Sequence, residues 1–137
     1  FLQLLRRPPD RWAWMSFTCR DGGHLSDGTA LSAAARTCGA VPRVAAVGIN
    51  CTRPEHVPEL ISAVRNATEK LIIVYPNAGG RYDAERKTWE DDPPRLDWPA
   101  LVAEWRDLGA TVIGGCCCIG PEDISNIRSR LLPSGQA

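Results

Sequence analysis

The chain has 137 residues and carries 16 Lys and Arg residues against 16 Asp and Glu residues, so its formal net charge is zero. This balance excludes a polybasic nucleic-acid binder or membrane-surface binder. With 44% hydrophobic and 23% charged residues the composition is that of a globular domain, and no apolar run approaches the ~18 residues that a transmembrane helix needs. We therefore expect one domain with neither nucleic acid nor membrane as a partner.

The first residues have the pattern of a helix end. Residue 1 is Phe, and residues 1–7 place their charges after the apolar part, which a secretory signal does not do. Pro8 and Pro9 then stop the pattern. We expect the chain to begin inside a larger protein, and the alternative is a processed or trimmed N-terminus.

Four apolar runs follow along the chain, and each ends in a polar or glycine-rich turn. They cover residues 13–19, 44–51, 71–75 and 110–115. Short and nearly continuous runs rich in β-branched residues are typical of strands that are buried on both faces, as in a parallel sheet.

Helical patterns lie between and after these runs. They cover residues 31–36, 55–68 and 96–108 and a last segment that starts at Pro121. Ser26 or Asp27 is the expected cap before the first helix, and Gly109 is the expected stop after the third. The last helix has its proline at an early position and acidic residues in its first turn.

The resulting order, four strand–helix units in succession, predicts an α/β fold with parallel strands. Four units are about half of an eight-fold (β/α) barrel, which typically needs ~250 residues, and a flat doubly wound sheet is the alternative. No Gly-x-Gly-x-x-Gly motif follows the first strand, so dinucleotide binding has no support. The long charged connection over residues 81–94 leaves the end of the third strand, either as part of a site or as a solvated loop.

Six cysteines stand in this short chain, and three of them are consecutive. A disulfide framework is disfavoured, because there is no signal peptide and adjacent cysteines do not easily meet disulfide geometry with each other. We interpret Cys38 and Cys19 as buried, inert thiols. A redox protein that uses the triplet at 116–118 remains an alternative.

Cys51 differs from these two, because it closes the second strand while Cys116 and Cys117 close the fourth. In a parallel sheet both positions are C-terminal strand ends, which lie at the same edge of the sheet, where ligands bind. Three thiolates meeting there would form a soft, zinc-selective site with one open position, which is the catalytic pattern. Gly114 and Gly115 are expected to let the backbone turn so that both following cysteines face one metal ion.

Motifs over nearly the whole chain resemble the homocysteine S-methyltransferase family of zinc-dependent (β/α) barrel enzymes. They include Trp14-Met15-Ser16-Phe17, Asp21-Gly22-Gly23-His24, Gly48-Ile49-Asn50-Cys51, Tyr75-Pro76-Asn77, Lys87-Thr88-Trp89 and Gly114-Gly115-Cys116-Cys117. The resemblance implies that residues 1–137 form a single partial barrel domain, a fragment with strands five to eight. It also implies zinc as cofactor and Cys51, Cys116 and Cys117 as its ligands.

The resemblance further implies methyl transfer to homocysteine that gives methionine, with S-methylmethionine or S-adenosylmethionine as the donor. Asn77 at the strand rim is a candidate either for the fourth position at the zinc or for contact with the substrate. Asn50 beside the ligand, and Asp21 and His24 in a loop on the same face, are the other candidate substrate contacts. Trp89 in the long loop is a candidate for lining the donor site. Cys118 stands where the family usually has Arg, and we interpret it as a non-ligand.

The cysteines and the length of the chain lead to two further expectations. Cysteines without disulfides indicate a reducing compartment, so the cytoplasm is the expected location. The alternative function is a non-catalytic zinc-binding fragment that keeps the metal but lacks the substrate half, and we expect the isolated chain to be weakly active at best.

Overall fold

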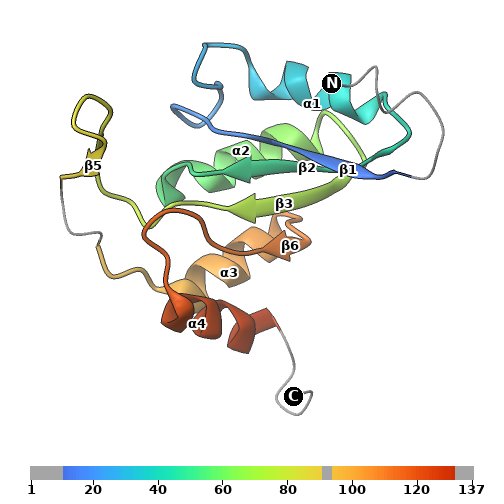
Figure 1. The fold of residues 1–137 in the computed structure, drawn as a ribbon. Helices are drawn as coiled ribbons and strands as arrows, with labels where there is room; N and C mark the ends of the chain where they lie inside the picture. Colours follow the sequence, from blue (N-terminus) through green and yellow to red (C-terminus); the bar gives the residue numbers. More distant parts are fainter. Residues whose placement is uncertain (1–10, 91–93, 132–137) are drawn as a thin grey trace.

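The computed structural model describes residues 11–90 and 94–131, and its centre is a four-stranded parallel sheet. The strands are β1 (Ala13–Phe17), β2 (Val44–Asn50), β3 (Leu71–Tyr75) and β6 (Val112–Ile113). They lie side by side in the order β1-β2-β3-β6, and each pairs in parallel with the next (Figure 1). The α/β fold with parallel strands that the sequence predicts is confirmed, although the fourth strand is shorter than expected.

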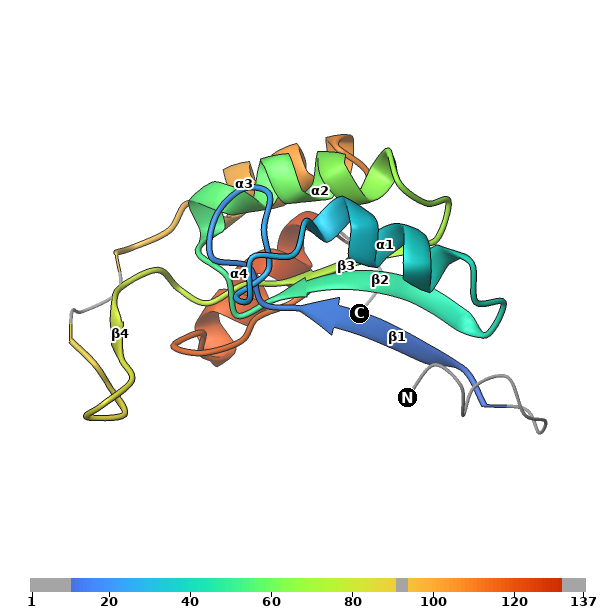
Figure 2. The same ribbon diagram turned by 90° about the horizontal axis from the view of Figure 1, so that it is seen from above.

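Within the described residues, three helices connect the strands and cover one side of the sheet, and a fourth follows the last strand (Figure 2). They are α1 (Leu31–Gly39), α2 (Val57–Arg65), α3 (Trp98–Asp107) and α4 (Pro121–Leu131), with a short 3-10 turn, η2 (Pro54–His56), before α2. Figure 2 shows α1, α2 and α3 together on the same side of the sheet. Strands in chain order with their helices on one side are the arrangement of a (β/α) barrel, whereas a doubly wound sheet carries helices on both sides. No helix within the described ranges is both long and apolar enough to cross a membrane.

The core lies between the sheet and these helices. Val47 pairs with Ile72 and Ile49 pairs with Val74, and all four side chains are fully buried. They pack with one face of α2, whose buried residues are Val57, Leu60, Ile61 and Val64. The alternate residues of the strands point to the other side of the sheet.

That second side of the sheet is apolar but uncovered in the described chain. Trp14 and Leu71 stand in one row across β1, β2 and β3 and are 60% and 53% exposed. Val112 on β6 is 49% exposed. A sheet that carries helices on one side and apolar side chains on the other has the pattern of a barrel wall, whose inner face is normally filled by side chains.

Of the helix ends predicted from the sequence, one is confirmed and another is wrong. Gly109 has φ +110° and stands two residues after the end of α3 at Asp107, which confirms the predicted stop. Ala30 is the residue before α1 and no side chain caps that helix, so the predicted cap is wrong. Asp27 instead accepts a hydrogen bond from the N–H of Thr29, and the hydroxyl of Ser26 donates to the carbonyl of Thr18. The expected helix end at residues 1–7 lies outside the described residues.

The connection after β3 contains a small hairpin that the sequence analysis did not predict. Its strands β4 (Tyr82–Asp83) and β5 (Thr88–Trp89) are antiparallel. The Asp83 carboxylate accepts hydrogen bonds from the N–H groups of Glu85 and Arg86 at 2.8 and 2.9 Å, which fixes the turn. The hairpin leaves the C-terminal end of the sheet, at the left of Figure 1.

The buried face of α2 is expected to contribute strongly to the free energy of unfolding. Leu60→Ala is expected to lower the free energy of unfolding by about 2–5 kcal/mol, because Leu60 is fully buried and its removal leaves a cavity. Ile124→Ala on α4 is the control, since that side chain is 42% exposed and its loss is expected to cost far less. Urea unfolding followed by circular dichroism measures both, and equal losses would contradict this view of the core.

Candidate metal centre

Backbone hydrogen bonds that continue past the strands bring three cysteines to one end of the sheet. The N–H of Cys51, directly after β2, donates to the carbonyl of Tyr75 at 3.0 Å. The N–H of Cys116 donates to the carbonyl of Pro76 at 2.8 Å, and the carbonyl of Cys117 accepts from Ala78 at 3.1 Å. The segments after β2, β3 and β6 are therefore linked to one another at the C-terminal edge of the sheet.

The three sulfur atoms form a compact cluster. The Sγ atoms of Cys51 and Cys117 are 3.3 Å apart, those of Cys116 and Cys117 are 3.9 Å apart, and all three lie within 4.8 Å of one another. A tetrahedral zinc ion with Zn–S bonds of about 2.3 Å requires sulfur separations of about 3.8 Å. The observed distances lie on either side of that value, so these residues fit a zinc ion.

Two cysteines hold unusual backbone conformations at this edge. Cys51 has φ 46° and Cys118 has φ 62°, the left-handed region that non-glycine residues rarely adopt. The sulfurs of Cys116 and Cys117 meet as expected after Gly114 and Gly115, and neither glycine has a positive φ. Gly115 is needed for space instead, since a Cβ there would lie 2.3 Å from Cγ2 of Ile119.

The surroundings of Cys51 favour the protonated thiol when no metal is bound. Burial is the largest cause, and together with the contacts to the sulfurs of Cys117 and Cys116 it raises the pKa of Cys51 to about 12. A divalent cation reverses this preference, because a coordinating thiol is deprotonated. The cluster is therefore suited to a metal ion more than to free thiolates.

Asn77 and Thr52 support this edge from inside the protein. Asn77 is 5% exposed, its Nδ2 donates to the carbonyl of Cys51 at 3.2 Å, and its Oδ1 accepts from the N–H of Gly79 at 3.0 Å. The buried Thr52 hydroxyl donates to the carbonyl of Asn50 and accepts from the N–H of Cys19, both at 2.9 Å. Both side chains thus fix the backbone on either side of Cys51. Sequence reasoning missed Thr52, which directly follows the ligand motif.

The other predicted polar residues, Asn50, Asp21 and His24, form hydrogen bonds of their own and are not part of the sulfur cluster. Asn50 donates from Nδ2 to the hydroxyl of Thr18 at 3.1 Å. Asp21 accepts hydrogen bonds from the N–H groups of Gly23 and His24 at 2.8 and 2.7 Å, and its Oδ1 is 3.0 Å from Nδ1 of His24. The Gly23 hydrogen bond is the main reason why the pKa of Asp21 is lowered.

The remaining cysteines behave as the sequence predicts. Cys19 and Cys38 are buried, and burial raises the pKa of both thiols, that of Cys19 to about 11. Cys118 is exposed and stands outside the group of three sulfurs. All six cysteines are free thiols in the structure.

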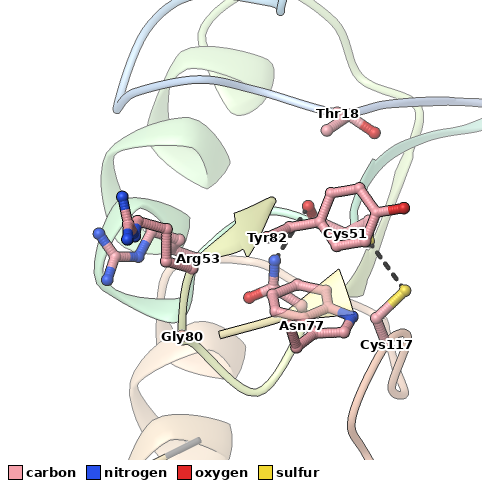
Figure 3. A pocket seen from close by; sticks show the side chains of 9 residues that line it. Thr18, Cys51, Arg53, Asn77, Gly80, Tyr82 and Cys117 are labelled. Atoms are coloured by element: carbon pink, nitrogen blue, oxygen red, sulfur yellow. Dashed lines mark hydrogen bonds between the residues drawn. The ribbon is translucent and has the colours of Figure 1, made fainter. Parts of the chain in front are cut away.

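A cavity of about 650 Å³ opens beside the sulfurs, and Figure 3 shows the side chains around it. Its size is typical of small-molecule sites. The lining residues are Thr18, Cys51, Arg53, Asn77, Gly80, Arg81, Tyr82, Trp89 and Cys117. Trp89, the candidate for lining the donor site, lines this cavity, whereas Thr18 and Arg53 were missed because no motif marks them.

Comparisons with known proteins agree with this geometry. A family model described as homocysteine S-methyltransferase matches residues 2–131. A homocysteine S-methyltransferase of Bacillus subtilis is 43% identical over 128 residues, which are 93% of this chain and 41% of that protein. The homocysteine S-methyltransferase of Escherichia coli is 39% identical over 129 residues, which are 93% of this chain and 42% of that protein.

A solved structure shows the same fold. The metallated form of the homocysteine methyltransferase MmuM from Escherichia coli matches with a TM-score of 0.76 and 33% identity, over 94% of this chain and 39% of that one. The chain thus spans about two fifths of the length of the curated relatives that it matches. The match to the family model over nearly all residues, together with the sulfur cluster at the strand ends, shows that this chain belongs to the homocysteine S-methyltransferase family.

Proposed function

We propose that the cluster of Cys51, Cys116 and Cys117 holds a zinc ion at which homocysteine is methylated to methionine. The observation that carries this proposal is the approach of three sulfurs, from the ends of β2 and β6, to within 4.8 Å of one another beside an open cavity. Three protein ligands with a free position are the pattern of catalytic zinc sites. The names of the relatives supply the substrate, homocysteine.

The chemistry of the ligands matches this reaction. When bound, zinc supplies the Lewis acidity that lowers the pKa of an incoming thiol, which is ordinarily ~8.5. Three thiolate ligands around a divalent ion carry a net charge of 2 − 3 = −1, and this excess favours a cationic donor nearby. Thiolates are also the soft ligands that select zinc over the harder divalent cations.

The reaction itself needs few groups from the protein. The thiolate sulfur of homocysteine attacks the methyl carbon of S-methylmethionine or S-adenosylmethionine, and the carbon–sulfur bond of the sulfonium breaks with its electron pair going to the leaving sulfur. The leaving group is a neutral thioether, so no general acid is required. The tasks of this chain are to hold the sulfur ligands, through Asn77 and the backbone around Cys51, and to bring both substrates into one cavity.

Four residues remain our candidates for contacts with the substrates. Asn77 lines the cavity, and Asn50 holds Thr18, which lines it too. Asp21 and His24 form a hydrogen-bonded pair in the loop after β1. We place all of them at the same end of the sheet as the cysteines, where barrel enzymes build their sites.

We also propose that the four strands are the last four of an eight-stranded barrel, within one partial domain over residues 1–137. The sequential strand order, the helices on one side and the apolar row with Trp14 and Leu71 on the other support this assignment. The free state of all six cysteines supports a reducing compartment, and we propose the cytoplasm.

Replacing the ligands tests the zinc site. Cys51→Ser, Cys116→Ser and Cys117→Ser are each expected to lower zinc content from about one ion per chain to a small fraction, because a site with three protein ligands loses one of them. Methionine formation from homocysteine and S-methylmethionine is expected to fall with it. Cys118→Ser is the matched control, since this neighbour lies outside the cluster and is expected to keep the metal.

Metal analysis of the purified variants and a methionine assay give the two readouts. Full zinc content in Cys51→Ser or Cys117→Ser would refute the ligand assignment. Zinc bound stoichiometrically without any methyl transfer would favour the alternative function, a zinc-binding chain without its own catalysis.

Zinc binding is also expected to depend on pH in a defined direction. Because the pKa of the free Cys51 thiol is raised to about 12, this thiol is protonated at neutral pH and must lose its proton when the metal binds. Affinity therefore rises as pH rises, with about two to three protons released per ion. Calorimetric titrations in buffers of different ionisation enthalpy count these protons, and an affinity that does not change with pH would contradict thiol ligation.

A further inference from the structure

The hairpin formed by β4 and β5 places two aromatic rings at the cavity beside the sulfur cluster. Tyr82 and Trp89 pair across its strands, with ring centroids 5.4 Å apart and planes inclined by 55°. Both line the cavity that Cys51 and Cys117 line. Figure 3 labels Tyr82 beside Cys51 and Cys117. The rings come from a segment that lies more than thirty residues after Cys51, so the fold has brought them to this place.

From this arrangement we infer that Tyr82 and Trp89 bind the sulfonium group of the methyl donor through the faces of their rings and thereby favour a cationic donor over a neutral one. The inference rests on the proposed methyl transfer and adds the residues that recognise the second substrate. An aromatic face attracts a cation electrostatically without neutralising it, so the methyl group of the donor stays reactive.

The charges around the cavity leave the rings as the natural partners of a cation. Within the described chain, the residues that line the cavity include two arginines and no carboxylate. The guanidinium of Arg53 is 3.1 Å from the carboxylate of Glu55, and Arg81 forms an ion pair with Glu90. The positive charge of each arginine is thus balanced by an acidic neighbour, which reduces its repulsion of a sulfonium.

The two arginines also suit the other end of an amino-acid donor. A donor such as S-methylmethionine carries a carboxylate at its α-carbon, and a guanidinium is the side chain best shaped to bind that group. The cavity therefore offers aromatic faces for the sulfonium and guanidinium groups for the carboxylate.

The hairpin holds the rings in place before any substrate arrives. The N–H of Glu90 donates to the carbonyl of Arg81 at 2.9 Å, so the strand pairing extends beyond Tyr82 and Trp89. The turn at Asp83 closes the other end of the hairpin with two hydrogen bonds. Rings that are already positioned lose little conformational freedom on binding, which favours affinity.

A matched pair of ligands separates charge recognition from simple hydrophobic contact. The probes are S-methylmethionine and the neutral amino acid of the same shape in which a CH group replaces the sulfonium sulfur. Calorimetric titration of the full chain, in both zinc-loaded and zinc-free form, is expected to show binding of the cation about tenfold tighter than binding of its neutral counterpart.

Variants of the two rings locate the source of this preference. In Trp89→Leu and Tyr82→Leu the preference is expected to fall severalfold toward equal affinities, while zinc content stays unchanged. Tyr82→Phe is expected to retain it, because the ring remains and only the hydroxyl is lost. Trp12→Leu is the control for removing a tryptophan, since Trp12 is exposed and does not line the cavity.

Each outcome supports or overturns the inference. Equal affinities of the two probes in the unaltered protein, no binding of S-methylmethionine, or a preference that survives in both leucine variants would overturn it. A preference that is lost in Cys51→Ser but kept in Trp89→Leu would assign cation recognition to the sulfurs instead. Absence of zinc binding, with the preference intact in the zinc-free protein, would refute the proposed zinc site but leave the role of the rings standing.

Discussion

The site depends on the alignment of parallel strand ends, which backbone hydrogen bonds extend beyond the sheet. The N–H groups of Cys51 and Cys116 donate to the carbonyls of Tyr75, the last residue of β3, and of Pro76, which follows it. The end of β3 thus fixes the position of both ligand segments along the strand direction, although Cys51 and Cys117 are 66 positions apart in the chain. A register slip of one residue would move a ligand by about 3.3 Å, more than a Zn–S bond length.

Features of the fold and site that follow from this topology were predictable from the sequence. Four apolar runs with helical patterns between them imply parallel strands, and parallel strands place Cys51 and Cys116 at the same edge. The burial of Cys19 and Cys38 was predictable too, because a free cysteine is among the residue types most often found buried. These features were predictable because they depend on the hydrophobic pattern and the direction of whole strands, and not on the contacts of single residues.

Details that depend on single residues were not predictable in this way. The hairpin of β4 and β5 has strands of only two residues each, too short to show an alternating pattern. The left-handed conformation at Cys51 and Cys118 opposes the local preference of cysteine, so tertiary contacts must enforce it. Asp27 has the residue type of a helix cap, but its carboxylate bonds to Thr29 inside the preceding loop, a contact that competes with capping.

Charge explains why one cavity suits both proposed substrates. A carboxylate at its wall would bind the cationic donor strongly, but it would also repel a homocysteine thiolate placed close to the same methyl group. Aromatic faces avoid this conflict, because Tyr82 and Trp89 attract a cation while carrying no net charge. The acidic groups near the cavity, Glu55 and Glu90, are each paired with an arginine. The negative charge at the reacting centre is therefore carried by the sulfur ligands and by the homocysteine thiolate.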